Sequence, residues 1–342
     1  MSKIRVLVAD DSAFIRKILS DILNSDTELE VVGSAKNGEE VLKKVKHLEP
    51  DILTLDLVMP KKNGLVVLRE LMEINPLPIV VISAFSKEVS KLTINALEYG
   101  AVDFITKPHG EISLNMEDIK KEIINKVKSA FKANLKKPKS AEKIGRYDFT
   151  EKSNKVITIG SSTGGPKALE EIVPILPKNI PSPVLIVQHM PPLFTKSLAN
   201  RLDNLSKIKV KEGKDGEKVK NGTAYIAPGD FHMEIKVVNN KPILTLNKKP
   251  KVLGVRPSID KMMKSVSKIY KEKTIGIVLS GIGRDGTIGS KFIKKNKGTV
   301  IIQDKDSSTV YGMPGSVINS GFYDAVIPLE KIGITLVRLL ET

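Results

Sequence analysis

The first third of the chain alternates short apolar segments with amphipathic ones, and this alternation limits it to few folds. Helices are expected where apolar residues recur every three or four positions, and strands where short apolar runs end at polar or turn residues. Regular strand–helix alternation predicts a doubly wound α/β domain, with helices on both faces of a five-stranded parallel sheet. The expected strands are Ile4–Ala9, Leu29–Ala35, Ile52–Asp56, Ile79–Ser83 and Asp103–Thr106, and the expected helices are Ser12–Asn24, Gly38–Leu48, Gly64–Ile74 and Ser86–Tyr99.

This pattern is interrupted once, between Asn134 and Asn154. Lys136-Lys137-Pro138-Lys139 and the polar residues that follow have no sustained periodicity, which is typical of an exposed linker. Before the interruption, one closing helix is expected from an apolar stripe at Ile119, Ile123, Val127 and Phe131. The sequence therefore predicts a domain at 1–133, a linker at 134–154 and a second domain at 155–342.

The second domain repeats the strand–helix pattern, which predicts another doubly wound α/β domain with a mostly parallel sheet. Its expected strands are Val156–Ile159, Val184–Gln188, Thr223–Ile226, Ile243–Leu246, Thr274–Leu279 and Thr299–Gln303, with Asp230–Asn240 also extended. Its expected helices are Pro166–Val173, Phe194–Leu205, Ser258–Tyr270, one that begins near Gly286, and Pro314–Asn319, which is expected to close the domain.

Composition excludes several kinds of site and partner. The chain of 342 residues has no cysteine, so a thiol nucleophile, a disulfide and a cysteine-bound metal are all excluded. No apolar run reaches the roughly 18–20 residues that span a membrane, and no signal peptide precedes the first strand. The net charge of +16 is compatible with a polyanionic partner, but the lysines are dispersed and aromatic residues are only 4%. We therefore expect a cytoplasmic protein that neither enters membranes nor binds DNA.

Polar residues stand at the carboxyl ends of the first domain's expected strands. Asp10 and Asp11 follow the first strand, Asp56 ends the third, Ser83 ends the fourth and Lys107 follows the fifth. Doubly wound sheets bind ligands at this edge. Three converging carboxylates favour a Mg²⁺ ion, beside which a carboxylate can attack a phosphoryl group. The serine hydroxyl and the lysine ammonium would then bind the phosphoryl oxygens.

The segments VLVADDSAFIRK, DLVMPKKNG, VISA and ITKP resemble the response-regulator receiver family over about residues 1–130. The resemblance implies that Asp56 is the phosphorylated residue and that Asp10, Asp11, Asp56 and the Val58 carbonyl hold Mg²⁺. It also places Phe104 at the family's switch-aromatic position, although a static role in the core explains this residue nearly as well.

Three polar segments follow expected strands of the second domain, and together they contain a serine, a histidine and an aspartate. The first is the Gly-rich turn 160–166, which contains Ser161, Ser162 and Thr163; the second ends in His189; the third contains Asp285. The helix N-terminus after the first turn favours an anion. A nucleophile, a general base and an orienting acid are thus predicted at one sheet edge. Spacing alone does not choose among the three hydroxyls.

The other histidines fit this chemistry less well. His47 lies among lysines in an expected surface helix, and His109 follows the Lys107-Pro108 turn. His232 is the one remaining alternative to His189.

Three other functions were weighed for the second domain. Gly160-x-Ser162-x-x-Gly165 is a degraded dinucleotide fingerprint, but Gln188-His189 stands where a ribose-binding acid is expected. A purely structural role for the Gly-rich turns is the second alternative. A receiver-controlled transcriptional regulator would need a helix-turn-helix, for which this domain is too long and too rich in strands.

SSTGGP, QHMPP, APGDFHM, RPSID, SGIGRDG and YGMP resemble the catalytic domain of the chemotaxis protein-glutamate methylesterase family, over about residues 155–340. The resemblance implies a triad of Ser162 as nucleophile, His189 as base and Asp285 as acid, with no cofactor for catalysis. It also implies a structural role for His232. Asp260 could rival Asp285, but its place at a helix start favours a cap.

The resemblance further implies the substrates and the control of this hydrolase. Glutamate γ-methyl esters on methyl-accepting chemoreceptors would be hydrolysed to release methanol, and glutamines would be deamidated by the same chemistry. A chemotaxis histidine kinase would phosphorylate Asp56 and activate the enzyme. Our hypothesis for this control is that the unphosphorylated receiver docks over the Ser162 cleft and blocks receptor access.

Overall fold

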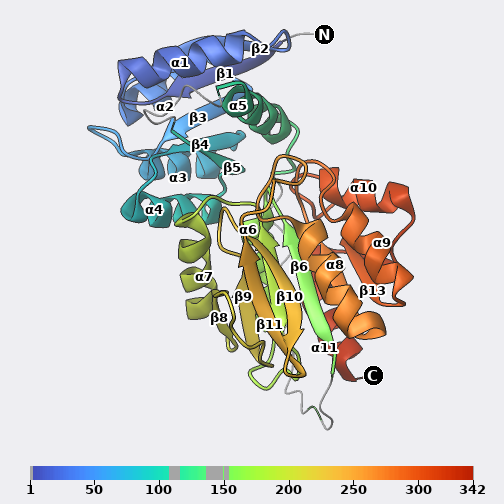
Figure 1. Ribbon diagram of the computed structural model, residues 1–342. Helices are drawn as coiled ribbons and strands as arrows, with labels where there is room; N and C mark the ends of the chain where they lie inside the picture. Colours follow the sequence, from blue (N-terminus) through green and yellow to red (C-terminus); the bar gives the residue numbers. More distant parts are fainter. Residues whose placement is uncertain (1–2, 108–115, 136–148, 150–153, 342) are drawn as a thin grey trace. The chain divides into compact units, whose positions relative to one another are not determined.

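The protein is described by a computed structural model that divides into two units, Met1–Leu135 and Lys136–Thr342 (Figure 1). The structure describes residues 3–107, 116–135, 149 and 154–341. Most of the predicted linker therefore lies outside the described residues, and so do Pro108 and His109. Each unit is described by itself.

The first unit has a five-stranded sheet in the order β2-β1-β3-β4-β5, and every neighbouring pair is parallel. The predicted doubly wound α/β fold is therefore confirmed. All five strands have the bounds predicted from their apolar runs: β1 Ile4–Ala9, β2 Leu29–Ala35, β3 Ile52–Asp56, β4 Ile79–Ser83 and β5 Asp103–Thr106.

The helices of this unit begin where short polar side chains cap them. The side chains of Ser12, Asn37, Asn63 and Ser86 each accept a hydrogen bond from a backbone N–H in the first turn. Helices α1 and α5 pack together on one face of the sheet, while α2, α3 and α4 form neighbouring pairs on the other. The helices are α1 Ala13–Asn24, α2 Gly38–Leu48, α3 Gly64–Ile74, α4 Lys87–Glu98 and α5 Met116–Phe131.

The predicted apolar stripe of α5 enters the core only in its middle. Ile123 and Val127 are fully buried against the sheet and α1, whereas Ile119 is partly buried. Phe131, the last residue of the helix, keeps 39% of its surface exposed. The stripe thus extends beyond the sheet that it covers.

The second unit has a seven-stranded sheet in the order β14-β13-β12-β6-β7-β9-β8, and each recorded pairing within it is parallel. A separate antiparallel hairpin joins β10 and β11. The strands are β6 Val156–Ser161, β7 Val184–Gln188, β8 Lys209–Glu212, β9 Thr223–Ile226, β10 His232–Val238, β11 Lys241–Asn247, β12 Thr274–Val278, β13 Thr299–Gln303 and β14 Ala325–Ile327.

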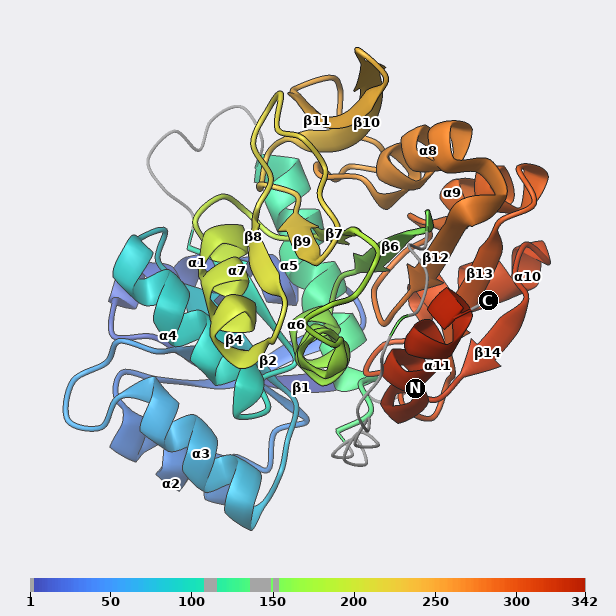
Figure 2. The ribbon, with the colours of Figure 1, turned by 90° about the horizontal axis from the view of Figure 1, so that it is seen from below.

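Helices cover both faces of this sheet (Figure 2). Helices α6, α7 and α11 lie on one face, while α8, α9, α10 and the β10–β11 hairpin pack a common apolar core on the other. The helices are α6 Gly165–Ile172, α7 Phe194–Leu205, α8 Ile259–Tyr270, α9 Thr287–Lys295, α10 Gly312–Ser320 and α11 Leu329–Glu341.

Three elements of the second unit were not predicted. Strand β8 carries two lysines and a glutamate, and only Val210 is buried, which fits an edge strand protected by charge. Strand β14 has three residues, too few for a periodic pattern. Helix α11 has a clear helical period in its buried residues, so the expectation that Pro314–Asn319 closes the domain was wrong.

Candidate functional site

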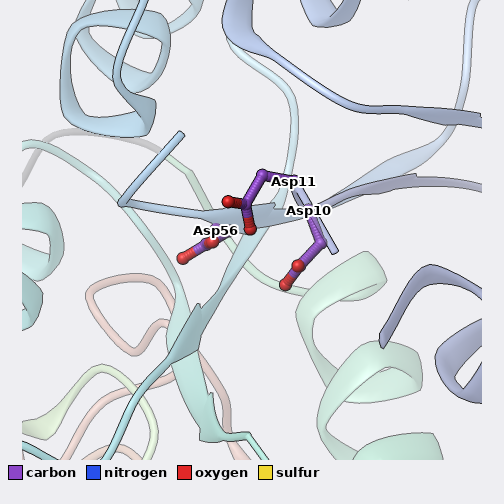
Figure 3. A group of neighbouring side chains, drawn as sticks. All are labelled: Asp10, Asp11 and Asp56. Carbon is purple, nitrogen blue, oxygen red and sulfur yellow. The ribbon is translucent and has the colours of Figure 1, made fainter. Parts of the chain in front are cut away.

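Three carboxylates gather beyond the ends of β1 and β3 in the first unit (Figure 3). These strands are neighbours, so Asp10 and Asp11, after β1, meet Asp56, at the end of β3. One oxygen from each of the three carboxylates lies within 4.8 Å of the others. Asp10 and Asp56 are buried and Asp11 is exposed. A buried set of oxygen donors open on one side fits Mg²⁺, which prefers such ligands and keeps several waters.

The Lys107 ammonium neutralises part of this charge. Its Nζ lies 2.8 Å from Oδ2 of both Asp10 and Asp56. Burial works to lower the pKa of Lys107, but the hydrogen bonds and charges of the two carboxylates outweigh it and raise that pKa. Burial raises the pKa of Asp56 despite the lysine. Because the ionised form of Asp56 is poorly solvated, further positive charge at this site would stabilise it.

Two other predicted residues lie near Asp56 in different ways. The backbone N–H of Val58 donates to Asp56 Oδ1 at 3.2 Å, which keeps this residue beside the carboxylate. The Ser83 hydroxyl instead pairs with Thr93 Oγ1 at 2.7 Å and donates to the Ala84 carbonyl. To bind a phosphoryl oxygen, the Ser83 hydroxyl has to break its hydrogen bond with Thr93 on α4.

Phe104 occupies a core position in this state of the receiver. Its side chain is 2% exposed, and the Lys126 ammonium lies 5.2 Å from the centre of its ring. Lys126 also donates to the Phe104 carbonyl at 2.7 Å, which ties α5 to β5. The static interpretation of Phe104 is therefore sufficient for the conformation described.

In the second unit, three adjacent strands supply the predicted triad. Strand β6 lies between β7 and β12, and the chain order reverses there, with β7, β9 and β8 to one side and β12, β13 and β14 to the other. Such a reversal leaves a crevice at the carboxyl ends of the strands. Ser162 follows β6, His189 follows β7 and Asp285 lies in the loop after β12.

His189 and Asp285 form a direct hydrogen bond, with 2.9 Å between Nε2 and Oδ2. Asp285 is 3% exposed. The N-terminus of α8 surrounds its carboxylate: the backbone N–H groups of Ile259 and Asp260 donate at 2.7 and 2.9 Å, and the Ser258 hydroxyl donates at 3.1 Å. These donors hold the carboxylate in one orientation toward the imidazole.

Electrostatics keep Asp285 ionised although it is buried. Burial works to raise the pKa of Asp285, but the hydrogen bond and charge of His189, with the backbone donors of α8, lower it. A carboxylate can only accept, so His189 carries its proton on Nε2. Nδ1 is thereby left as the acceptor of the imidazole, the role that a general base needs.

Accessibility separates the three candidate hydroxyls. Ser161 is fully buried and donates to Gln188 Oε1 at 2.7 Å, and Thr163 is 3% exposed. Ser162 alone of the three is partly exposed. Its backbone N–H donates to the Ser280 carbonyl at 3.0 Å, which fixes the turn against the loop that leads to Asp285. Ser162 is therefore the most accessible of the three candidates within its unit.

Gln188 links the serine turn to the histidine, a role that the sequence analysis missed. Its Nε2 donates to the Ser162 carbonyl at 2.9 Å and, more weakly, to the His189 carbonyl at 3.4 Å. Its Oε1 accepts from Ser161. The signal was a polar residue inside a buried strand, which we used only against the dinucleotide interpretation. Because Gln188 is an amide, this strand end has no carboxylate to bind the ribose of a dinucleotide.

The two rival residues have structural partners. His232 begins β10, is fully buried, and its Nε2 lies 3.1 Å from the Pro250 carbonyl. Asp260 caps a helix as expected, but not its own: Ser258 caps α8, while Asp260 Oδ1 accepts from the backbone N–H groups of Gly286 and Gly289 in α9. The helix-start pattern could not reveal this, because the acceptor and its donors are distant in sequence.

Gly229 supports the segment that follows His189, and we expect Gly229→Ala to be damaging. An added Cβ would lie 2.2 Å from the backbone nitrogen of Pro192 and 2.3 Å from the carbonyl carbon of Pro191. Backbone atoms cannot move aside cheaply, so we expect a loss of about 1–3 kcal/mol in the free energy of unfolding. Denaturant unfolding of the full chain measures it.

Gly315→Ala is the matched control for Gly229→Ala. Its Cβ would meet only the Tyr311 ring, at 3.3 Å, inside helix α10. We expect a change within about 1 kcal/mol, because alanine also favours the helix. Equal losses in the two variants would contradict the assigned role of Gly229.

Two protein families match different parts of this chain. The response regulator receiver domain family matches residues 6–117, and the CheB methylesterase family matches residues 157–336. A protein-glutamate methylesterase/protein-glutamine glutaminase of Pyrococcus abyssi is 48% identical over 350 residues, which cover 99% of this chain and 94% of that protein. A Thermotoga maritima protein of the same description is 47% identical over 339 residues, 98% of either chain.

A solved structure supports the fold of the second unit. The crystal structure of the Thermotoga maritima CheB methylesterase catalytic domain is 52% identical in sequence and aligns with a TM-score of 0.54. It covers 55% of this chain and 99% of that domain. Within the part of the chain that the structure describes, no helix is long and apolar enough to cross a membrane.

Proposed function

This chain belongs to the CheB methylesterase family and carries a response-regulator receiver domain, and we propose that Ser162, His189 and Asp285 are its catalytic triad. As a member of this family it is a methylesterase and glutaminase of chemotaxis, a carboxylic ester hydrolase. The observation that carries the triad is the part-buried 2.9 Å hydrogen bond between His189 and Asp285. These residues follow the two strands that flank β6, and the partly exposed Ser162 follows β6 itself.

In the first step, Ser162 Oγ attacks the γ-carbonyl carbon of a glutamate methyl ester while His189 Nδ1 takes the hydroxyl proton. Asp285 accepts from Nε2–H throughout and stabilises the imidazolium. The carbonyl oxygen becomes an oxyanion that needs backbone donors. Of the described residues, none accepts from the N–H of Ile282, next to Gly281 in the acid loop, so this N–H is available.

The remaining steps restore the enzyme. The tetrahedral intermediate collapses, and His189 returns its proton to the leaving methoxide, which departs as methanol. A water molecule then attacks the acyl-enzyme, with His189 again taking a proton, and releases the glutamate carboxylate and free Ser162. On a glutamine side chain the same sequence releases ammonia.

The substrates that we propose are methyl-accepting chemoreceptors, and the test is product release. Full-length protein is incubated with a receptor fragment that carries glutamate γ-methyl esters, and methanol is quantified over time. A matched fragment with glutamines is assayed for ammonia. We expect both products, and no methanol above the enzyme-free rate would contradict the proposal.

For the receiver, we propose that a chemotaxis histidine kinase in the cytoplasm phosphorylates Asp56 and thereby raises the esterase rate. Asp10, Asp11, Asp56 and the Val58 carbonyl would hold Mg²⁺, which supplies positive charge for the transferred phosphoryl group. Asp56 Oδ attacks the phosphorus atom of the kinase's phosphohistidine, the P–N bond breaks, and the imidazole of the kinase leaves. Lys107 and Ser83 bind the phosphoryl oxygens once they release their present partners.

We expect Asp56→Asn to lose the stimulation of methanol release by a small phosphodonor such as acetyl phosphate, because the amide forms no acyl phosphate. The stimulated and unstimulated rates of the same preparation are compared in the presence of Mg²⁺. Asp21→Asn is the control, since Asp21 is exposed and, among the residues that the structure describes, its side chain pairs only with Lys17 on α1. Stimulation of the Asp56 variant at the wild-type level would refute this assignment.

A further inference from the structure

Two carboxylates near the N-termini of α8 and α9 each accept hydrogen bonds from the start of the other helix. Asp285 lies just before Gly286, the N-cap residue of α9, yet it accepts from the first two N–H groups of α8 as well as from that of Gly286, at 3.1 Å. Asp260 lies in the first turn of α8, yet its Oδ1 accepts from Gly286 at 2.9 Å and Gly289 at 2.7 Å, at the start of α9. Each carboxylate therefore caps the other helix, and both donors and acceptors are buried.

This exchange requires the two helices to approach closely. An added Cβ on Gly289 would lie 2.7 Å from Met263 Cβ and 3.3 Å from Asp260 Cα. Asp260 thus ties the loop that carries Asp285 to the first turn of α8. If the Asp260 acceptor were lost, the Gly289 N–H would be buried without its partner and the Gly286 N–H would keep only Asp285 Oδ1, at 3.1 Å, so the loop would lose the contacts that hold it to α8.

Asp260 also places a second acidic group next to Asp285. Asp260 is 5% exposed, and its Oδ2 has no hydrogen-bond partner among the described residues. Burial and then the charge of Asp285 raise the pKa of Asp260 to about 6. The pKa of Asp285 is lowered instead. Asp285 therefore stays ionised beside His189, while Asp260 changes its protonation state near its pKa of about 6.

We propose that Asp260 is a positioning residue of the hydrolase: it fixes the Asp285 loop through Gly286 and Gly289, and its charge strengthens His189 as a base. This inference rests on the proposed triad and adds a fourth group that touches neither substrate nor imidazole.

The charged groups around the pair determine the direction of the effect. His189 faces Asp285 from the end of β7; Lys261 follows Asp260 on α8, and the exposed Arg284 precedes Asp285 in its loop. Because the pKa of Asp260 is about 6, the negative charge that Asp260 adds beside Asp285 is lost on the acidic side of neutrality. A variant without this ionisable group must lose that part of the pH dependence, so the acidic limb of its activity profile moves toward lower pH.

Two substitutions separate the two parts of the role. In Asp260→Asn the amide oxygen still accepts from α9, so we expect kcat within a few-fold of wild type but an acidic limb of kcat/KM shifted to lower pH. In Asp260→Ala the acceptor is gone, and we expect kcat per folded molecule to fall by roughly tenfold or more, since misplaced catalytic groups are costly.

The assay is methanol release by the full chain across a range of pH, with the folded fraction measured by circular dichroism. Asp203→Asn is the control, because Asp203 also accepts from a backbone N–H, that of Val210 in the edge strand β8, away from the central strands that lead to the triad. Its profile should match that of wild type.

The outcomes distinguish this inference from the proposed function. If wild type releases methanol, Ser162→Ala does not, and both Asp260 variants keep the wild-type kcat and pH profile per folded molecule, then Asp260 is only structural and the inference is overturned. If Ser162→Ala is as active as wild type, the triad itself fails. A shifted profile in Asp260→Asn, with a lower kcat in Asp260→Ala, supports both.

Discussion

Ser162→Ala is expected to abolish methanol release, lowering kcat by roughly 10⁴-fold or more, because the substitution removes the proposed nucleophile of the acyl-enzyme. Loss of a triad nucleophile leaves only the rate enhancement due to binding and oxyanion stabilisation. Ser162 is partly exposed and its backbone N–H, which the substitution retains, anchors the turn to Ser280. The fold should therefore survive, and the measurement is methanol release from methylated receptor fragment at saturating substrate.

Ser161→Ala is the control that tests the choice of hydroxyl. Ser161 is buried, and its loss leaves Gln188 Oε1 without its donor, which costs stability by about 1–3 kcal/mol. We expect a lower denaturation midpoint but a kcat within about tenfold of wild type, since the nucleophile remains. An inactive but folded Ser161→Ala beside an active Ser162→Ala would transfer the nucleophilic role to Ser161.

Asp285→Asn is expected to have the second largest effect, a decrease in kcat of about 10³–10⁴-fold. An ionised Asp285 fixes the imidazole proton on Nε2, and an amide in its place permits the wrong tautomer. The change also costs stability, because both carboxylate oxygens now accept from donors, so the amide nitrogen must face one of them. Methanol release and denaturant unfolding are measured together.

Asp215→Asn is the control for this substitution. Asp215 Oδ1 accepts from the backbone N–H of Leu246 at 2.8 Å on an exposed loop, so it repeats the carboxylate-to-amide change away from the triad. We expect wild-type kcat. If Asp285→Asn also kept the wild-type kcat while folded, Asp285 could not be the group that orients His189.

The first unit was predictable because local signals and global fold agree. Strands β3 and β4 are mainly apolar runs that end in a polar residue, and Ser12 or Asn63 precedes a helix that it caps. The carboxyl ends of parallel strands share one sheet edge, so strand bounds alone brought Asp10 and Asp56 together. The Ser83 hydroxyl was less predictable, because its pairing with Thr93 depends on how α4 packs on β4.

The second unit was harder where structure depends on distant partners. Strand β8 exists because Val210 and its neighbours pair with β9, and its own residues are mostly charged. Strand propensity of this kind depends on context, which sequence periodicity does not record. Helix α11, in contrast, has a periodic pattern that the sequence analysis did not use.

The sequence by itself determined the two α/β units, the positions of their main strands along the chain, and the three loops that carry a hydroxyl, an imidazole and a carboxylate. These features follow from periodicity and turn residues, which act over a few positions. Only the tertiary structure decided that Ser162 is the partly exposed hydroxyl, that Gln188 ties its turn to His189, and that Asp260 caps α9. Burial and hydrogen-bond partners belong to contacts between distant segments, and these exist only once the sheet and helices have packed.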